Sequence, residues 1–454
     1  MKKFLFAASV CAIALASCNK DNLAPQADFK AGLPAKPQAH VPVDVNGLIT
    51  KSFLSKDTVW LIDGVSFVAP GQTLTIEAGT FLTSGNVKSY NDEVYGAQNI
   101  RGVLVVPKTA KLNAIGTAAA PIVFTSPNAS GSRNPGDFGG VIMLGNATTN
   151  QPATTRIEGV PAPIGVDVTF GGSNPADNSG TLKYVRIEFA GYNLTENNEI
   201  NGLTLGGVGN GTTLENIQVS WGKDDGFEFF GGTVNAKYLV ASSNDDDDFD
   251  FDFGYTGTIQ YALSLKDPNS TNSISGGNSD SNGLESDNNG AGDASRLPLT
   301  NPKLRNFTFL GIKDEAVATT KLKYGNRWRR ASSLDIESSI IAGYATGASF
   351  ESISGGNFSN NVVHGYAAAF NGSAPGSGNS TSVSSDATSY LALAGGTNIF
   401  YPVSGGFNPF VLRPTATSPA YGTGTSYKGA IDPAVTNPSQ VWTFGWTQFS
   451  PKTY

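Results

Sequence analysis

The chain has 454 residues and a formal net charge of −7, from 37 acidic and 30 basic side chains. This acidic balance argues against nucleic acid as a partner, because binding to a phosphate backbone depends on clustered Lys and Arg. The chain contains only two cysteines, Cys11 and Cys18, so it is neither a disulfide scaffold nor a cysteine-rich metal protein.

The N-terminus has the pattern of an export signal. A basic tip, Met1–Lys3, precedes the apolar stretch Phe4–Ala16, which is shorter than the roughly 20 residues that a membrane-spanning helix needs. This stretch runs into Leu15-Ala16-Ser17-Cys18, which resembles a lipobox, where the signal is removed before a cysteine that then carries diacylglycerol. We therefore expect a signal peptide over residues 1–17 and lipidation of Cys18. The alternative is an ordinary signal peptide with an incidental cysteine.

Residues 18–45 are expected to form a flexible tether, because they are poor in apolar side chains and contain four prolines. The run Asn19-Lys20-Asp21-Asn22 is similar to the short signals that send lipoproteins of some Gram-negative lineages to the cell exterior. The expected location is therefore the outer membrane, with the protein lipid-anchored and facing outward. The membrane, reached through the lipid, is the first expected partner.

The body of the chain repeats with a period of about 22 residues. Five short apolar segments align on their third residues, which are Asn216, Tyr238, Tyr261, Asn306 and Asn360. The first two steps are 22 and 23 residues long, and we expect two turns in the third step, of 45, and two turns with an insertion in the last, of 54. This period predicts an all-β solenoid, a right-handed single-stranded parallel β-helix. A large β-sandwich is the alternative.

A second strand is expected about 11 residues after the first in each turn. Strict alternation in Gly226–Phe230 and Asp248–Phe253 places Phe227 and Phe229 in phase with Phe249 and Phe251, inside the coil. The acidic residues between them, Glu228, Asp250 and Asp252, should then face outward. By the same spacing, residues 316–319 should form the second strand of a later turn.

Several motifs carry a family resemblance. Leu74-Thr-Ile-Glu-Ala-Gly-Thr80 and Pro121-Ile-Val-Phe-Thr-Ser126 are similar to turns of bacterial pectin-lyase-like β-helix proteins, a largely uncharacterised group. Tyr427-Lys-Gly-Ala-Ile431 resembles the closing segment of the same group. We expect the coil over residues 46–430 and a closing segment over residues 431–454. The resemblance implies the fold and export from the cell, and it implies no particular activity.

Acidic residues concentrate in residues 224–252, and the repeat places them side by side. Asp225 should lie beside Asp247, and Glu228 beside Asp250, on neighbouring turns about 4.8 Å apart. Three outcomes stay open. The carboxylates form a solvated face, or they bind a hard cation such as Ca²⁺, or one of them stays protonated and acts as a general acid. Asn244 is a neutral oxygen donor nearby, and Glu285 and Asp287 should extend the row.

The same stretch resembles an enzyme motif in part. Asp225-Gly226-Phe227 followed by Asp246-Asp247 is similar in spacing to the paired acidic motifs of polygalacturonases. Those enzymes also carry a Gly-His-Gly soon afterwards, which this chain lacks, because its only histidines are His40 and His364. Asp225, Asp246 and Asp247 therefore remain catalytic candidates by resemblance only, and His364 is expected to be a residue of the coil.

A basic group follows the acidic stretch, at Lys321, Lys323, Arg327, Arg329 and Arg330. Uronate lyases of the pectin-lyase-like fold use Ca²⁺ near an Arg or Lys base, so the resemblance makes Arg327 a further catalytic candidate. Without chemistry, Tyr324, Arg329 and an exposed Trp328 would suit an acidic sugar. The alternative is a solvated turn whose arginines balance the neighbouring acids.

The expected function is binding of extracellular glycan or a partner protein by an exposed face of the coil, without catalysis. A polysaccharide lyase or glycoside hydrolase acting on an acidic polysaccharide is the alternative, and a structural subunit of an outer-membrane assembly is a further one. Ca²⁺ is the only cofactor that these patterns indicate.

Overall fold

The computed structural model describes residues 33–453, except 163–164, 196–197, 276 and 401–406. The expected signal peptide, Cys18 and the first part of the expected tether lie outside the described residues. Within the described part of the chain, no helix is long and apolar enough to cross a membrane.

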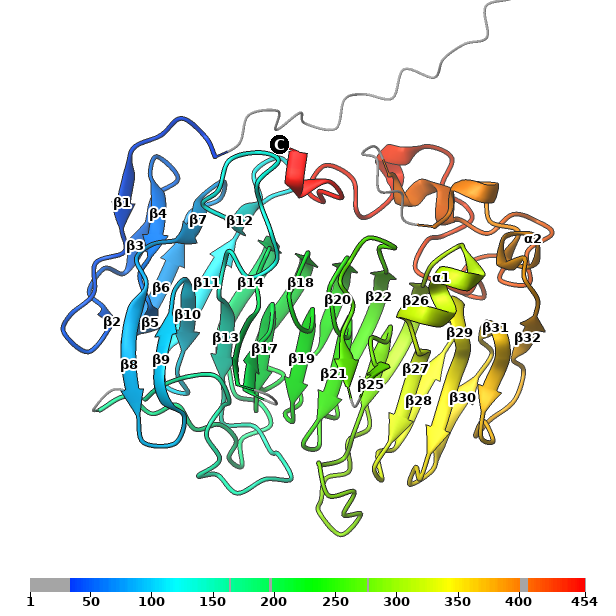
Figure 1. Cartoon of the computed structure of the whole chain (residues 1–454), viewed down its shortest axis with the longest axis horizontal. Coiled ribbons are helices and arrows are strands. Elements are labelled where there is room, and N and C mark those ends of the chain that lie inside the picture. Colours follow the sequence, from blue (N-terminus) through cyan, green and yellow to red (C-terminus); the bar gives the residue numbers. More distant parts are fainter. Residues whose placement is uncertain (1–32, 163–164, 196–197, 276, 401–406, 454) are drawn as a thin grey trace, which may run out of the picture.

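The strands wind into one long coil (Figure 1). A single sheet of 26 strands, whose neighbours pair in parallel along the coil, confirms the predicted right-handed parallel β-helix, and three antiparallel hairpins, β8–β9, β15–β16 and β23–β24, lie outside this sheet. The strands are β1 (Gln38–His40), β2 (Leu48–Ile49), β3 (Phe53–Leu54), β4 (Val59–Ile62), β5 (Val65–Val68), β6 (Thr73–Ile76), β7 (Phe81–Ser84), β8 (Lys88–Asp92), β9 (Gly96–Ile100), β10 (Val103–Val106), β11 (Lys111–Ile115), β12 (Ile122–Thr125), β13 (Gly140–Leu144), β14 (Gly180–Glu188), β15 (Tyr192–Thr195), β16 (Asn198–Ile200), β17 (Leu203–Gly206), β18 (Thr213–Ser220), β19 (Phe227–Phe230), β20 (Ala236–Ser242), β21 (Phe249–Asp252), β22 (Thr258–Leu265), β23 (Ile274–Ser275), β24 (Asn278–Ser279), β25 (Leu284–Ser286), β26 (Lys303–Leu310), β27 (Tyr324–Arg329), β28 (Leu334–Glu337), β29 (Ile340–Glu351), β30 (Gly356–Ser359), β31 (Val362–Asn371) and β32 (Ser380–Val383). The helices are α1 (Glu315–Lys321), α2 (Ala387–Leu391), η1 (Gly396–Asn398), η2 (Pro409–Leu412), η3 (Pro438–Gln440) and η4 (Pro451–Thr453).

The residues on which the repeat aligns form one corner of the coil. All five have a left-handed backbone, with φ of 54° at Asn216, 62° at Tyr238, 61° at Tyr261, 58° at Asn306 and 56° at Asn360. This conformation bends the chain between two strands of the same turn, and Asn adopts it more readily than most residues. At the two tyrosines, the rings of neighbouring turns stack with centroids 5.5 Å apart.

The interior is filled by side chains of equivalent positions on successive turns. Phe227 stacks on Phe249 with ring centroids 5.2 Å apart, and Phe229 stacks on Phe251 at 5.1 Å. All four rings are buried. The expected phase of these strands is therefore confirmed, and the side chains between the rings point away from the interior.

Two expectations about the repeat were wrong. Strand β22 pairs directly with β26, with Gln260 opposite Arg305, so the step from Tyr261 to Asn306 is one turn with a long insertion. Residues 316–319 lie in α1 and not in a strand, because the Asp314 carboxylate accepts the Val317 amide at 3.0 Å and caps a helix there. The strand of that turn is β27, a few residues later.

The coil also differs from its expected limits of 46–430. It begins within the expected tether, where Gln38–His40 pairs with β4, and its last paired strand, β32, ends at Val383. The described residues from 407 onward form a covering segment, which is longer than the expected closing segment.

This covering segment, residues 407–453, runs back along the outside of the coil toward earlier turns (Figure 1). The Ala430 amide donates to Thr308 Oγ1 at 2.9 Å, Gln448 and Gln218 exchange two hydrogen bonds of 2.8 Å, and Arg133 donates to the Pro451 carbonyl at 2.9 Å. Its apolar side chains pack on outward side chains of β20, β22, β26 and β29 and form a second core with them.

A different side of the coil carries the charges. The outward side chains of β19, β21, β25 and β27 form what we call the charged face. Its N-terminal neighbour, the outer side of β10 and β13, is covered by apolar residues of the loop 146–179, including Ile157, Val168 and Phe170. The charged face therefore begins where this apolar cover ends.

We expect Phe249→Ala to lower the free energy of unfolding by about 3–5 kcal/mol, because it removes a fully buried ring from the interior stack. Asp250→Ala, one residue later but facing outward, should cost little or stabilise. Urea denaturation of both variants measures the difference. A larger loss for Asp250→Ala than for Phe249→Ala would contradict the assigned phase.

Candidate functional site

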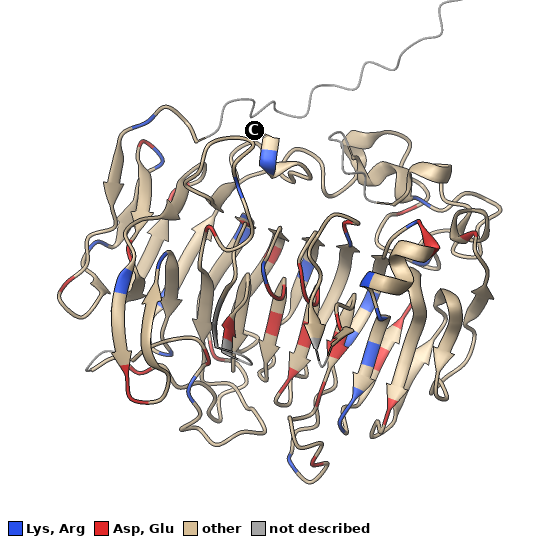
Figure 2. Cartoon of the chain, viewed as in Figure 1, with Lys and Arg blue, Asp and Glu red and all other residues tan. Residues whose placement is uncertain are grey.

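Three carboxylates stand in a row on the charged face. Glu228 lies opposite Asp250, and Asp250 lies opposite Glu285. The next position in the row is Arg327. Because adjacent strands lie about 4.8 Å apart, the row brings three acids and then a base within a short distance. The expected register of the acids is confirmed, and Figure 2 shows acidic residues on the middle strands and basic residues on the strands that follow.

The residues just before these strands add a second row of acids. Asp225 Oδ1 accepts the amide of Asp247 at 2.8 Å, and Asp247 Oδ1 accepts the amide of Asn282 at 2.5 Å. Each carboxylate thus holds the backbone of the next turn. Asp225 lies beside Asp247 as the repeat predicts, and both are buried.

Three insertions bring further acids that the sequence analysis did not name. Glu158, from the loop 146–179, and Glu199, from β16, raise the pKa values of neighbouring acids by their charge, including Asp224. Asp280, before β25, acts in the same way on Asp246 and Asp247. Insertions of irregular length carry these residues, so the 22-residue step gave no signal for them.

The acids are too close and too buried to ionise independently. Burial and the charges of neighbouring carboxylates raise the pKa values of Asp225, Glu228 and Asp250 well above the usual range. Burial raises the pKa of Asp246 to about 7 and, with Asp247 nearby, that of Glu285 to about 8. The cluster therefore holds protons near neutral pH unless another positive charge replaces them.

The donor set fits a hard cation. Oxygens of Asp224, Asp225 and Asp246 all lie within 4.8 Å of one another, and so do oxygens of Asp225, Glu228 and Asp250. Within the described residues, no ion pair reaches any of these five acids. Asp250 Oδ1 is also inaccessible to solvent and has no hydrogen-bond partner. Carboxylate oxygens in this number suit Ca²⁺.

Two residues expected at a metal centre have other contacts. Asn244 Oδ1 accepts the Gly222 amide at 3.0 Å, and its Nδ2 donates to Asp248 at 2.9 Å, so this side chain supports the corner and does not face the cluster. Asp247 belongs to neither group of three, and its Oδ1 accepts the Asn282 amide. The fully buried Lys266 donates to the Asp246 carbonyl behind the cluster.

The basic residues are paired with acids. Arg327 Nη1 lies 3.0 Å from Glu285 and 2.8 Å from Asp280, and Arg329 Nε lies 2.9 Å from Asp287. Burial lowers the pKa of Arg327, but the charges of Glu285 and Asp280 outweigh it and raise that pKa overall. Arg327 therefore stays protonated, which suits it to bind an anion and not to act as a base.

The expectation of an exposed Trp328 was wrong. Its side chain is fully buried in the interior, since β27 places it in the row of Phe229, Phe251 and Ser286. It cannot stack on a sugar. Tyr324 is partly exposed, with Lys323 and Arg327 each 5.5 Å from its ring centroid. The alternation of side chains in β27 predicts that Trp328 is buried, once this strand is aligned with Leu284 of the preceding turn.

The catalytic candidates are only partly brought together. Asp225 and Asp246 lie in one group of three, and a carboxyl group with a pKa of about 7 can give or take a proton near neutral pH. His364 is a buried residue of β31 whose Nε2 lies 2.8 Å from the Ser384 carbonyl, which agrees with its expected role in the coil.

The comparison with protein families agrees with this architecture. The chain belongs to the family of pectate-lyase-like beta helix domains, whose model matches residues 47–400. Among solved structures it is similar to pectate lyase Pel9A, with 14% sequence identity and a TM-score of 0.34, over 84% of this chain and 88% of that one. No match was found among the curated proteins.

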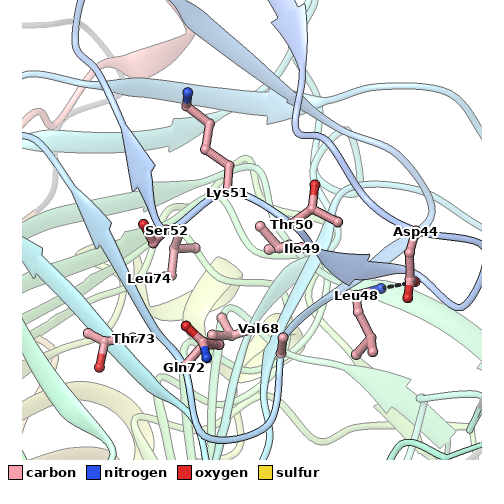
Figure 3. Close-up of a pocket in the computed structure, with 11 residues that line it drawn as sticks. Asp44, Leu48, Ile49, Thr50, Lys51, Ser52, Val68, Gln72, Thr73 and Leu74 are labelled. Atoms are coloured by element: carbon pink, nitrogen blue, oxygen red, sulfur yellow. Dashed lines mark hydrogen bonds between the residues drawn. The ribbon is translucent and has the colours of Figure 1, made fainter.

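A cavity of about 380 Å³, lined by residues between Asp44 and Leu74, lies near the N-terminal end of the coil (Figure 3). Its apolar lining comes from Leu48, Ile49, Val68 and Leu74, where the turns after β2 and β5 separate. It has no acidic cluster like that of the charged face, since Asp44 is the only acid in its lining. It is therefore separate from the candidate site.

We expect the cation-free protein to lose stability as pH rises between about 4.5 and about 8, the ordinary and raised pKa values of Glu158 and Glu285. Over this range the folded state binds more protons than the unfolded state, so stability falls with rising pH. Melting temperatures in EDTA measure the slope. It should be shallower in Asp225→Asn with Asp250→Asn, and a rise of stability over this range would contradict the assignment.

Proposed function

We propose that this protein binds an acidic extracellular polysaccharide on its charged face, and that Ca²⁺ takes part in the binding. The observation that carries the proposal is the group of acids around Asp225, whose carboxylates form no ion pair among the described residues and which lies on the same face as Arg327. Such a surface is costly for a purely structural coil, since buried like charges destabilise the fold.

Asp224, Asp225, Glu228, Asp246 and Asp250 would hold the cation. Bound there, Ca²⁺ would offer positive charge to a sugar carboxylate. Arg327, from β27, and Lys323, just before that strand, would contact a second carboxylate, because Arg and Lys bind carboxylates through charged hydrogen bonds. Two anionic contacts at different positions along the coil favour a polymer of acidic sugars over a single small anion.

We place this activity at the cell surface. The lipobox at residues 15–18 and the run after Cys18 support an anchor in the outer membrane with the coil facing outward. A glycan outside the cell would meet the charged face directly. A partner protein with an acidic surface loop is the competing ligand, and a pull-down from solubilised membranes would reveal it.

Calcium should stabilise the protein through these acids. A melt in millimolar Ca²⁺ should exceed a melt in EDTA, because cation at ten times its dissociation constant adds about 1.4 kcal/mol. Asp225→Asn with Asp250→Asn should abolish the difference. Asp335→Asn, in an ion pair with Arg305 on another side of the coil, is the matched control. Identical melting temperatures of the native protein in Ca²⁺ and in EDTA would contradict the calcium proposal.

Calcium-dependent retention on immobilised polygalacturonate or alginate then tests the glycan proposal, with neutral glycans as controls. The second candidate function, a polysaccharide lyase, is favoured by the pKa of about 7 at Asp246, which is one of the acids proposed to hold the cation. Release of unsaturated uronate during the same incubation, lost in Asp246→Asn, would establish the lyase. Retention without release would leave binding as the function.

Cys18→Ala should move the protein from the membrane fraction to the soluble fraction. One acyl chain gives marginal membrane affinity, whereas two or more hold a protein firmly. Fractionation of cells with an antibody to the coil measures the distribution. If the Cys18→Ala protein stays with the membrane, the anchor is not the lipid on this residue.

A further inference from the structure

The Asp280 carboxylate contacts two basic side chains of the charged face. Its Oδ1 is 3.0 Å from Lys323 Nζ and 2.8 Å from Arg327 Nη1. The side chain of Asp280 is 20% exposed, that of Lys323 is 32% exposed and that of Arg327 is 10% exposed. One carboxylate therefore bridges two cations at a place that solvent can reach.

The backbone around Asp280 is held firmly, so its side chain is the part free to move. Its amide donates to the Ser273 carbonyl at 3.1 Å, and its carbonyl accepts from Asn282 Nδ2 at 2.7 Å. The next residue, Ser281, donates from its hydroxyl to the Asp246 carbonyl at 3.0 Å, which fixes this stretch to the acidic cluster. The Asp280 carboxylate can therefore leave the two cations by a change of side-chain rotamer alone, without movement of the backbone.

We propose that Asp280 is a built-in competitor, whose carboxylate occupies the place on Lys323 and Arg327 that a carboxylate of an acidic sugar takes when it binds. The inference rests on the proposed function of polysaccharide binding. Both carboxylates cannot make the same contacts, so the ligand must displace the Asp280 side chain toward solvent. Arg327 keeps Glu285 as a partner at 3.0 Å after the exchange.

This arrangement makes the site selective for anionic sugars. A neutral or esterified sugar brings no charge to replace that of Asp280, so it would leave two cations without their partner. A partly exposed ion pair is weak and is screened by salt, so an anionic ligand can displace it. Asp280 lowers the affinity of the site for every ligand, but the loss of affinity is smallest for ligands that carry a carboxylate.

The test is calorimetric titration of galacturonate oligosaccharide at saturating Ca²⁺. If Asp280 fills the place nine-tenths of the time, Asp280→Asn should bind about tenfold more tightly than the native protein. Asp280→Glu should keep the native affinity. The control is Asp335→Asn, which removes a partly exposed carboxylate 2.7 Å from Arg305 and should change nothing. Unchanged or weaker binding by Asp280→Asn would overturn the competitor.

A second measurement does not depend on oligosaccharide binding. Labelling of Lys323 by an amine-reactive reagent should be several-fold faster in Asp280→Asn, and galacturonate monomer, but not galactose, should slow it again. If no protein binds oligosaccharide but this pattern holds, the proposed function fails and the competitor stands. Equal labelling of Lys323 in the native and Asp280→Asn proteins would overturn the competitor, whatever the glycan result.

Discussion

Each turn of the coil is positioned by hydrogen bonds to the turn before it, and this register governs the rest of the structure. Equivalent residues of successive turns lie about 4.8 Å apart. In the interior the register stacks Phe227 on Phe249, which stabilises the coil. Outside, the same register sets Glu228 beside Asp250, and the two acids cannot separate unless the stacked rings of the same two strands also shift. The packing of the rings in the interior therefore keeps the two acidic side chains close together on the outside, where they repel each other.

The charged face meets this repulsion in two different ways. At β25 and β27 the fold supplies its own cations, since Glu285 and Asp287 pair with arginines of the next turn. At β19 and β21 no described cation forms an ion pair with Glu228 or Asp250, and burial and neighbouring charges raise the pKa values of both carboxyl groups. The acids of one half of the face are paired with bases and those of the other half are not, and this difference is the basis of the cation site that we propose.

The 22-residue period predicted the positions that repeat from turn to turn, and it gave no information on the insertions that leave the coil. The alignment on Asn216 and Tyr238 found the corner residues, and alternation found the acids beside them. Trp328 was wrongly expected to be exposed, because its basic neighbours in the sequence were given more weight than the alternation of side chains in the strand. Glu158 and Asp280 were missed because they reach the site from insertions, whose lengths and paths only tertiary packing determines.

The covering segment has a consequence for the order in which the chain folds. Residues near Gln448 and Pro451 are synthesised after the turns that they cover, since they bind to Gln218 and Arg133, which belong to much earlier parts of the chain. Until they arrive, apolar side chains such as Leu263 and Ile340 on the outside of the coil are uncovered. A chain synthesised from its N-terminus therefore exposes an apolar strip on the coil, which the covering segment must bury before other chains bind to it.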